Sequence, residues 1–342
     1  MSQNQIYQQY LSLKAEFPEK YARDLAALIG IDEAQLCEAR IGHDAQALSS
    51  DFPALLQALE AAGEIRSITR NEYAVHEQSG VFTNLQPAGH AWIVLNPRDL
   101  DLRLLPSAWN SAFALREQSA RGERQSLQIF DRYGDAVLKI YTTDHTDMAA
   151  WQALLARFVR PAPAPRERLP VPVAEMPRGD AGDGSRLDAE WRVMTDVHQF
   201  SGLLKRHNVS RQQAFRAVGD DLARQVSNDA LGKILTRVRH DGNEIMIFVS
   251  NRGCTQIFTG VIEKLMQKDG WINVFNPDFT LHLMSDRIGE SWVTCKPGAD
   301  GFVTSLELFA TDGTQIAQLY GQRTEGEPEQ TRWREQISSL TR

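Results

Sequence analysis

The stretches QSLQIFDRYG at 125–134 and TSLELFATDG at 304–313 share one pattern of residues, and they decide how this fold is built. Positions that match between them differ by 179, and the same difference continues beyond them. The matching pairs are Ser126 and Ser305, Phe130 and Phe309, Gly134 and Gly313, and Tyr141 and Tyr320. This constant spacing indicates that the chain contains two copies of one structural module.

The repeat extends towards the N-terminal side of both stretches. WIVLNPRD begins at Trp92 and WINVFNPD begins at Trp271, which is again a difference of 179. The Asn-Pro pairs inside these two segments are displaced by one further residue, which predicts a local insertion. Matches spread so widely along the chain favour duplication over chance.

A proline-rich stretch separates the two copies. PAPAPRERLPVPVAEMP at 161–177 contains six prolines, and GDAGDGS at 179–185 follows it. Because proline blocks helices and sheet ladders, this stretch is predicted to be an extended surface linker. We therefore predict an N-terminal repeat at 1–160, a linker at 161–187 and a C-terminal repeat at 188–342.

Each copy begins with helical spacing and continues with strand spacing. Helices are predicted within 3–62 and 188–238, strands follow from about residue 65 and over 244–321, and helices containing Trp151 and Trp333 close the copies. Consecutive short strands favour an α+β fold in which each copy has a large antiparallel sheet. The strands predicted in the first copy are 64–70, 73–78, 90–95, 100–105, 125–131 and 136–141.

Composition excludes several classes of protein. The net charge of −7 disfavours broad nucleic-acid binding, although YARDLAALIGIDEAQL at 21–36 faintly resembles a helix-turn-helix. Cys37, Cys254 and Cys295 are scattered and odd in number, which is typical of a reducing cytosol and not of a zinc site. The start of the sequence has no signal-peptide pattern, and no apolar run is long enough to span a membrane.

Longer segments resemble the HemS/ChuS family of bacterial haem-utilisation proteins. In the second copy they are TDVHQFSGLLKRHNVSRQQAFRAVGDDLA (195–223), NEIMIFVSNRGCTQIFTGVIEK (243–264) and VTSLELFATDGTQIAQLYGQRTEGEPEQ (303–330). In the first copy they are NEYAVHEQSG (71–80) and LNPRDLDLRL (95–104). The resemblance implies a duplicated fold with two large stacked antiparallel sheets, and a cytoplasmic protein that handles imported haem.

His198 lies in TDVHQF, at the position that resembles the family's ligand to the haem iron. We expect it on a helix, with Met194, Thr195, Ser201 and Gly202 on the same face. His207 and His282 are the next candidates. Aligning the helices through Ala22 and Ala214 places Ile6 opposite His198, so the first copy is predicted to lack this ligand and the chain to bind a single haem.

Other residues match family positions around the haem. The resemblance places Arg103 on the side of the iron opposite the histidine, where a fixed cation would stabilise negative charge. Phe248 matches an apolar wall position. The residues expected near the porphyrin edge, where charged and polar donors would bind the propionates, are Lys296, Gln318, Tyr320 and Arg323.

Two functions follow from the resemblance. The protein would degrade haem oxidatively and release iron, with electrons from an external reductant. Alternatively it would be a non-enzymatic carrier that stores haem or delivers it to other proteins. Haem is the expected ligand in both cases, the haem-import machinery and an electron donor are possible partners, and the duplication makes a monomer or weak dimer sufficient.

Overall fold

A computed structural model describes residues 1–89, 91–119, 122–162, 169–171, 184–324 and 326–341. Of the linker predicted at 161–187, residues 163–168 and 172–183 lie outside the described part. No helix among the described residues is long and apolar enough to cross a membrane.

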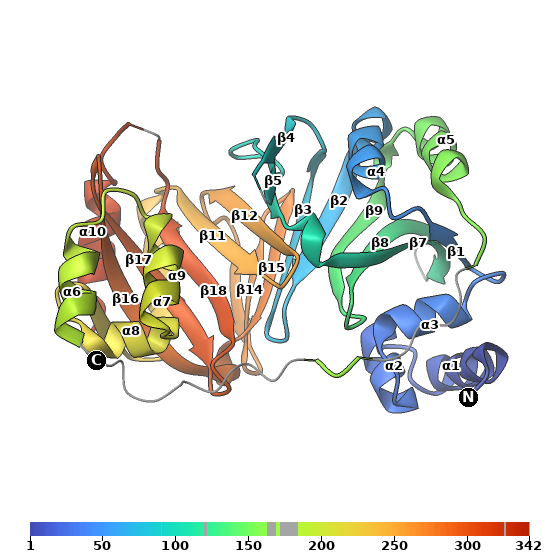
Figure 1. Cartoon of the computed structure of the whole chain (residues 1–342), viewed down its shortest axis with the longest axis horizontal. Coiled ribbons are helices and arrows are strands. Elements are labelled where there is room, and N and C mark those ends of the chain that lie inside the picture. Colours follow the sequence, from blue (N-terminus) through green and yellow to red (C-terminus); the bar gives the residue numbers. More distant parts are fainter. Residues whose placement is uncertain (90, 120–121, 163–168, 172–183, 325, 342) are drawn as a thin grey trace. The chain divides into compact units, whose positions relative to one another are not determined.

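The two halves of the chain have the same order of elements (Figure 1). The first half contains α1 (Gln3–Glu16), α2 (Ala22–Ile29), α3 (Glu33–Ala39), β1 (Ala45–Leu48), α4 (Phe52–Ala58), η1 (Leu59–Ala62), β2 (Gly63–Arg70), β3 (Ala74–Val81), β4 (Leu85–Ala88), β5 (Ala91–Val94), β6 (Asp101–Leu104), η2 (Pro106–Ala108), β7 (Trp109–Ser119), β8 (Gly122–Asp131), β9 (Ala136–Thr146) and α5 (Met148–Phe158).

The second half repeats this order apart from η1. It contains α6 (Gly184–Arg192), α7 (Gln199–His207), α8 (Arg211–Ala217), β10 (Ala223–Val226), α9 (Ala230–Asp241), β11 (Ile245–Ser250), β12 (Cys254–Gly260), β13 (Leu265–Lys268), β14 (Trp271–Phe275), β15 (Phe279–Met284), η3 (Ser285–Arg287), β16 (Ile288–Gly298), β17 (Gly301–Ala310), β18 (Gln315–Gly321) and α10 (Thr331–Ser338).

The strands form two antiparallel sheets of nine strands, which confirms the predicted α+β fold with a tandem duplication. One sheet has the order β1-β7-β8-β9-β2-β3-β15-β14-β13, and the other has the order β10-β16-β17-β18-β11-β12-β6-β5-β4. Each sheet therefore combines six strands of one half with three strands of the other half.

Pairing registers repeat with the spacing found in the sequence. Ser126 lies opposite Tyr141 in β8 and β9, and Ser305 lies opposite Tyr320 in β17 and β18.

The sequence pattern missed β1, β4 and β7. In β7 the run 112–115 is buried on both faces of the sheet, so the strand lacks the alternation of apolar and polar residues that identifies a half-exposed strand.

The chain forms two compact units, and each unit includes six residues from the other half. Residues 71–76 belong to the unit of the second half, and residues 251–256 belong to the unit of the first half. Asn71 and Asn251 begin these segments in the same way. The Oδ1 atom of each accepts hydrogen bonds from the backbone N–H groups two and three residues further on, all at 2.9 Å. Each Nδ2 donates at 2.9 Å to a β-strand carbonyl, that of Ile316 or Val137.

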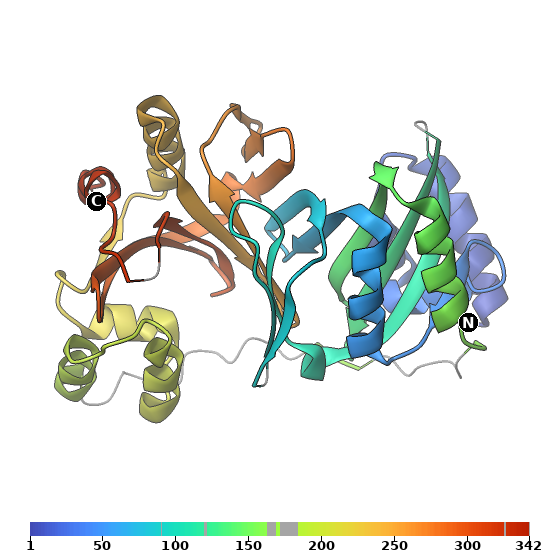
Figure 2. The same cartoon turned by 90° about the horizontal axis from the view of Figure 1, so that it is seen from above.

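In the unit of the second half, helices cover both faces of β16–β18 (Figure 2). Aromatic residues fill the space between one face and α6, α7 and α8, including Trp191, Phe200 and Phe215 of these helices. On the other face, α9 and α10 pack against Leu306 and Leu308. The predicted site residues of this unit lie on or beside the first of these faces.

Candidate functional site

Three of the predicted site residues lie on one face of the sheet in the unit of the second half. Phe248 on β11 is directly opposite Gln318 on β18, and Tyr320 follows two residues later on the same face. The rings of Phe248 and Tyr320 meet edge to face, with their centroids 5.1 Å apart. Burial raises the pKa of Tyr320, and the charge of Glu307 raises it further. This face therefore presents an aromatic surface beside hydrogen-bonding groups.

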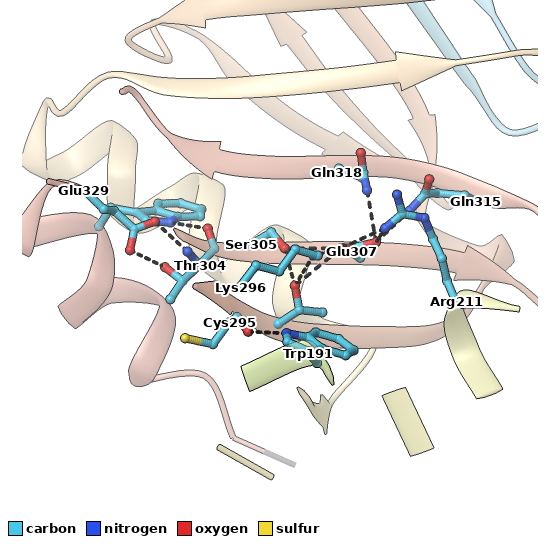
Figure 3. Close-up of polar contacts among 12 residues, drawn as sticks. Trp191, Arg211, Cys295, Lys296, Thr304, Ser305, Glu307, Gln315, Gln318 and Glu329 are labelled. Carbon is cyan, nitrogen blue, oxygen red and sulfur yellow. Dashed lines mark hydrogen bonds and ion pairs between the residues drawn. The ribbon is translucent and has the colours of Figure 1, made fainter. Parts of the chain in front are cut away.

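Glu307 is the centre of a buried polar network on the same face (Figure 3). Its Oε1 accepts a hydrogen bond from Lys296 Nζ at 2.6 Å, and its Oε2 accepts from Arg211 Nη1 and Gln318 Nε2, both at 3.0 Å. Lys296 also donates to Thr294 Oγ1 at 2.7 Å. Burial by itself would raise the pKa of Glu307, but the charges of Lys296 and Arg211 lower it to about 2. The carboxylate is therefore ionised and held by two cations.

Aromatic rings from the covering helices surround the Lys296 ammonium. Its Nζ lies 4.9 Å from the ring centroid of Phe200 on α7, 5.9 Å from that of Phe215 on α8 and 6.0 Å from that of Trp191 on α6. The guanidinium of Arg211 lies over Phe200 as well, at 5.1 Å. The side chain of Lys296 is only 4% exposed, so these rings and Glu307 enclose it.

His198 stands at the edge of this covered region. It is the residue immediately before α7, and its side chain is 90% exposed. Asp196 holds it in place, because Asp196 Oδ1 accepts from the backbone N–H of His198 at 2.8 Å and lies 2.7 Å from its Nδ1. The hydrogen bond from the backbone N–H of His198 lowers the pKa of Asp196 most. The interaction with the His198 ring and the charge of Arg323 lower it further.

The expectation that His198 lies on a helix with Met194 and Thr195 is wrong. Helix α6 ends at Arg192, and α7 begins only after His198. The carboxylate of Asp196 stabilises a turn between the two helices, because it bonds to a backbone N–H that is two residues away. In this turn the side chain of His198 stays 90% exposed.

The helix alignment that placed Ile6 opposite His198 is also wrong. Ser210 and Asp32 are the N-caps of α8 and α3, each in a capping box, and they differ by 178 positions. With this register, Lys20 and not Ile6 corresponds to His198. The first half still has no histidine at this position.

Arg323 follows β18, close to the turn that carries His198. The charge of Arg323 lowers the pKa of Asp196, and it also acts to lower the pKa of Glu329. Its Nε atom is buried and has no hydrogen-bond partner among the residues that the structure describes. A buried donor without a partner is costly, so Arg323 is suited to binding an anionic group from outside the chain.

Arg103 is in the other unit, on β6. It forms an ion pair with Asp101, which is two residues earlier on the same face of the strand, and its side chain is 34% exposed. Burial raises the pKa of Asp101, whereas Arg103 lowers it. The six other predicted site residues belong to the unit of the second half.

The corresponding face in the first half has acidic residues at three positions where the second half has cations. Its pairing registers match those of the second half residue by residue. The corresponding pairs are Lys296 and Glu117, Arg323 and Asp144, Arg211 and Glu33, Gln318 and Lys139, and Phe248 and Ile68. Glu33 forms an ion pair with Lys139, and Glu117 forms one with the buried Arg40, so the first half also has an ionic network but with different partners.

Sequence reasoning missed Asp196, Arg211 and Glu307. The spacing Asp-x-His in TDVHQF is a signal for Asp196, since an aspartate two residues before a histidine can reach both its backbone and its ring. Glu307 stands between Leu306 and Leu308, where an acidic residue in an apolar strand indicates a buried partner. Arg211 has no such local signal, because its partner lies far away in the sequence.

The fold and this site together define a class of duplicated α+β protein with one basic, aromatic sheet face and an exposed histidine oriented by a carboxylate. The haemin-degrading HemS.ChuX domain matches this sequence twice, over residues 30–158 and 208–340. The hemin transport protein HmuS of Yersinia pestis is 60% identical over 335 residues, which cover 98% of this chain and 97% of that protein.

Two solved structures cover the whole fold. The heme degrading enzyme ChuS of Escherichia coli O157:H7 is 58% identical, with a TM-score of 0.92 and coverage of 100% of both chains. The heme-binding protein PhuS of Pseudomonas aeruginosa, in its holo form, is 39% identical, with a TM-score of 0.94 and coverage of 100% of this chain and 99% of that chain. This chain belongs to the HemS/ChuS family, as the sequence resemblance predicted.

Proposed function

We propose that the protein binds one haem through His198 and serves haem-iron utilisation in the cytoplasm, where it degrades haem oxidatively with electrons from an external donor. The observation that carries this proposal is the imidazole of His198, which is 90% exposed and has Nδ1 engaged by Asp196. Such a ring has Nε2 available as a nitrogen ligand for iron. ChuS, described as a heme degrading enzyme, supports the same substrate and reaction.

The other residues have roles that fit a flat dianionic ligand. Phe248 and Tyr320 would line the macrocycle, and Arg323 and Gln318 would donate to the propionates. Lys296 would do so only if α6, α7 and α8 move, because its ammonium is enclosed by Glu307 and three aromatic rings. Haem held by the imidazole of His198 would supply oxygen-activating chemistry when it is reduced.

Arg103 is proposed to act on the opposite side of the iron from His198, a role that rests on the family resemblance. Its pairing with Asp101 keeps the guanidinium in a defined position on β6. A cation fixed in this way stabilises negative charge that develops during oxidation, because no reorganisation is needed at that moment.

A carrier is the second candidate function. It is favoured by PhuS, a relative described as a heme-binding protein. Carrier and enzyme would use the same ligand and the same contacts, so the two functions differ in turnover and not in binding.

Titration of the protein with haem is expected to give one tight site per chain. The first half has Lys20 at the position of His198, and it has Glu117 and Asp144 where the second half has Lys296 and Arg323. An acidic side chain cannot donate the charge-assisted hydrogen bond that Lys296 or Arg323 would give to a propionate. The measurement is the Soret absorbance against added haem, with His198→Ala as the control. Two equally tight sites, both with histidine-like spectra, would contradict the predicted asymmetry.

Replacing Arg323 is expected to affect mainly haem binding, whereas replacing Arg103 is expected to affect mainly haem degradation. Arg323→Ala removes a charge-assisted hydrogen bond of about 1.5–3 kcal/mol, so Kd rises roughly ten- to a hundredfold while the iron spectrum stays the same. Arg103→Ala lowers affinity little but slows reductant-dependent haem loss. The assay follows haem loss and its products under oxygen with a reductant and catalase.

Arg287→Ala is the matched control for this pair, because Arg287 is exposed and is paired only loosely with Asp286, at 4.0 Å. Haem loss at the wild-type rate in Arg103→Ala would rule out its proposed role. If the parent protein degrades haem no faster than free haem is degraded under the same reductant, the carrier function replaces the enzyme.

A further inference from the structure

Asp196 and His198 form a compact turn whose two hydrogen bonds converge on one oxygen. Asp196 Oδ1 lies 2.8 Å from the backbone nitrogen and 2.7 Å from the ring Nδ1 of His198. Thr195 and Gln199 brace the same turn, since Gln199 Oε1 accepts from Thr195 N at 3.0 Å and Gln199 Nε2 donates to Thr195 Oγ1 at 3.2 Å. The imidazole is therefore oriented although most of its surface is exposed.

The side chain that follows this turn is anchored to the sheet. Phe200, two residues beyond His198, is 2% exposed, and the Lys296 ammonium and the Arg211 guanidinium lie 4.9 and 5.1 Å from its ring centroid. Both cations are bound to Glu307. Residues on both sides of His198 are thus held, Asp196 by the turn and Phe200 by the buried network.

From this geometry we infer that Asp196 is a positioning residue for His198, keeping the ring proton on Nδ1 and leaving the Nε2 lone pair as the metal-binding atom. A neutral imidazole has one N–H and one lone pair, and a carboxylate at 2.7 Å from Nδ1 requires the N–H there. A carboxylate in this position also makes the ring a stronger electron donor to a bound metal. This inference rests on the proposed haem ligation by His198.

The other candidate histidines do not combine these features. His207 is 11% exposed and has Glu190 at 3.2 Å from its Nε2, so that nitrogen is not open to a ligand. His282 has Asn273 Oδ1, a neutral oxygen, at 2.6 Å from Nδ1. His240 has a carboxylate, Asp241, at 2.9 Å from Nδ1 and is 86% exposed, but it is on α9, which packs on the other face of the sheet.

The experiment compares Asp196→Ala and Asp196→Asn with the parent full-length chain. In the haem-free protein, nitrogen NMR of the histidine rings is expected to show the Nδ1–H form of His198 in the parent and a mixture of both ring forms in Asp196→Ala. Haem affinity is expected to fall about 10- to 100-fold in Asp196→Ala and less in Asp196→Asn, because the amide oxygen still accepts the hydrogen bonds. The iron–histidine stretching frequency of the ferrous protein should fall in the same order.

His240→Ala is the matched control, since it removes an exposed histidine with a carboxylate partner and should change none of these quantities. An Asp196→Ala variant with the parent's ring form and haem affinity would overturn the inference. Failure of the proposed ligation gives a different result: His198→Ala would then keep the parent's haem spectrum, whatever Asp196 does to the ring in the haem-free protein.

Discussion

Replacing His198 with alanine is expected to remove the nitrogen ligand of the haem iron, shift the Soret band and weaken haem binding by about a hundredfold or more, which is ~3 kcal/mol. The loss should be selective, because His198 is 90% exposed and its imidazole bonds only to Asp196 in the described structure. The free energy of unfolding of the haem-free protein should therefore stay close to that of the parent.

The measurements for His198→Ala are a haem titration and visible spectra of the ferric and ferrous forms. Added imidazole is expected to restore part of the parent spectrum, since it supplies the missing nitrogen to the vacated position. His240→Ala provides the control for removing an exposed histidine. A parent-like spectrum in His198→Ala would transfer the ligand role to another residue, with His207 and His282 tested next.

Replacing Glu307 with glutamine is expected to destabilise the unit of the second half by about 3–5 kcal/mol. The side chain is fully buried, and its carboxylate is the counter-charge of both Lys296 and Arg211. Glutamine keeps the shape but leaves two cations without a counter-charge, and an uncompensated buried charge is among the costliest defects in a fold. Urea unfolding of the haem-free protein, followed by tryptophan fluorescence, measures the loss.

Asp229→Asn is the control for this substitution, because it makes the same change in an exposed ion pair with Lys233, where less than about 0.5 kcal/mol is expected. Adding Lys296→Met to Glu307→Gln should recover part of the loss, since it removes one of the stranded charges. Parent-like stability of Glu307→Gln would show that the network does not hold α6, α7 and α8 on the sheet.

The same network predicts how stability depends on pH. The pKa of Glu307 is lowered from its ordinary value of 4.5 to about 2 in the folded protein, so its contribution is fully present above pH 4.5 and is lost as the pH falls towards 2. Glu307→Gln has no carboxyl to titrate at this position. The difference in stability between parent and variant should therefore shrink across this window of pH.

If haem binds at this face as proposed, the stability of the buried network affects how Lys296 takes part in binding. Lys296 cannot reach a propionate while its ammonium is enclosed by Glu307 and the rings of Trp191, Phe200 and Phe215. Replacing Lys296 would therefore affect both folding and binding. Arg323 is the cleaner test of propionate binding, because its buried Nε has no hydrogen-bond partner in the described part of the chain.

Much of the architecture was predictable from the sequence. The difference of 179 between Ser126 and Ser305 indicated the duplication, and the strand registers repeat with that spacing. The spacing of two between Gln318 and Tyr320 placed them on one face, because side chains alternate along a strand. The resemblance also indicated the HemS/ChuS family, to which the chain belongs.

By itself, the sequence of this protein determined what depends on local order and period: two α+β copies, their antiparallel strands and the fact that Gln318 and Tyr320 share one face of a strand. Only the tertiary structure decided which distant segments meet, such as Arg211 with Glu307, and how the last three strands of each sheet come from the other half. The reason is that such pairings depend on the free energy of the whole arrangement. The flanking leucines indicate that Glu307 has a buried partner, but only the fold identifies its partners as Lys296 and Arg211.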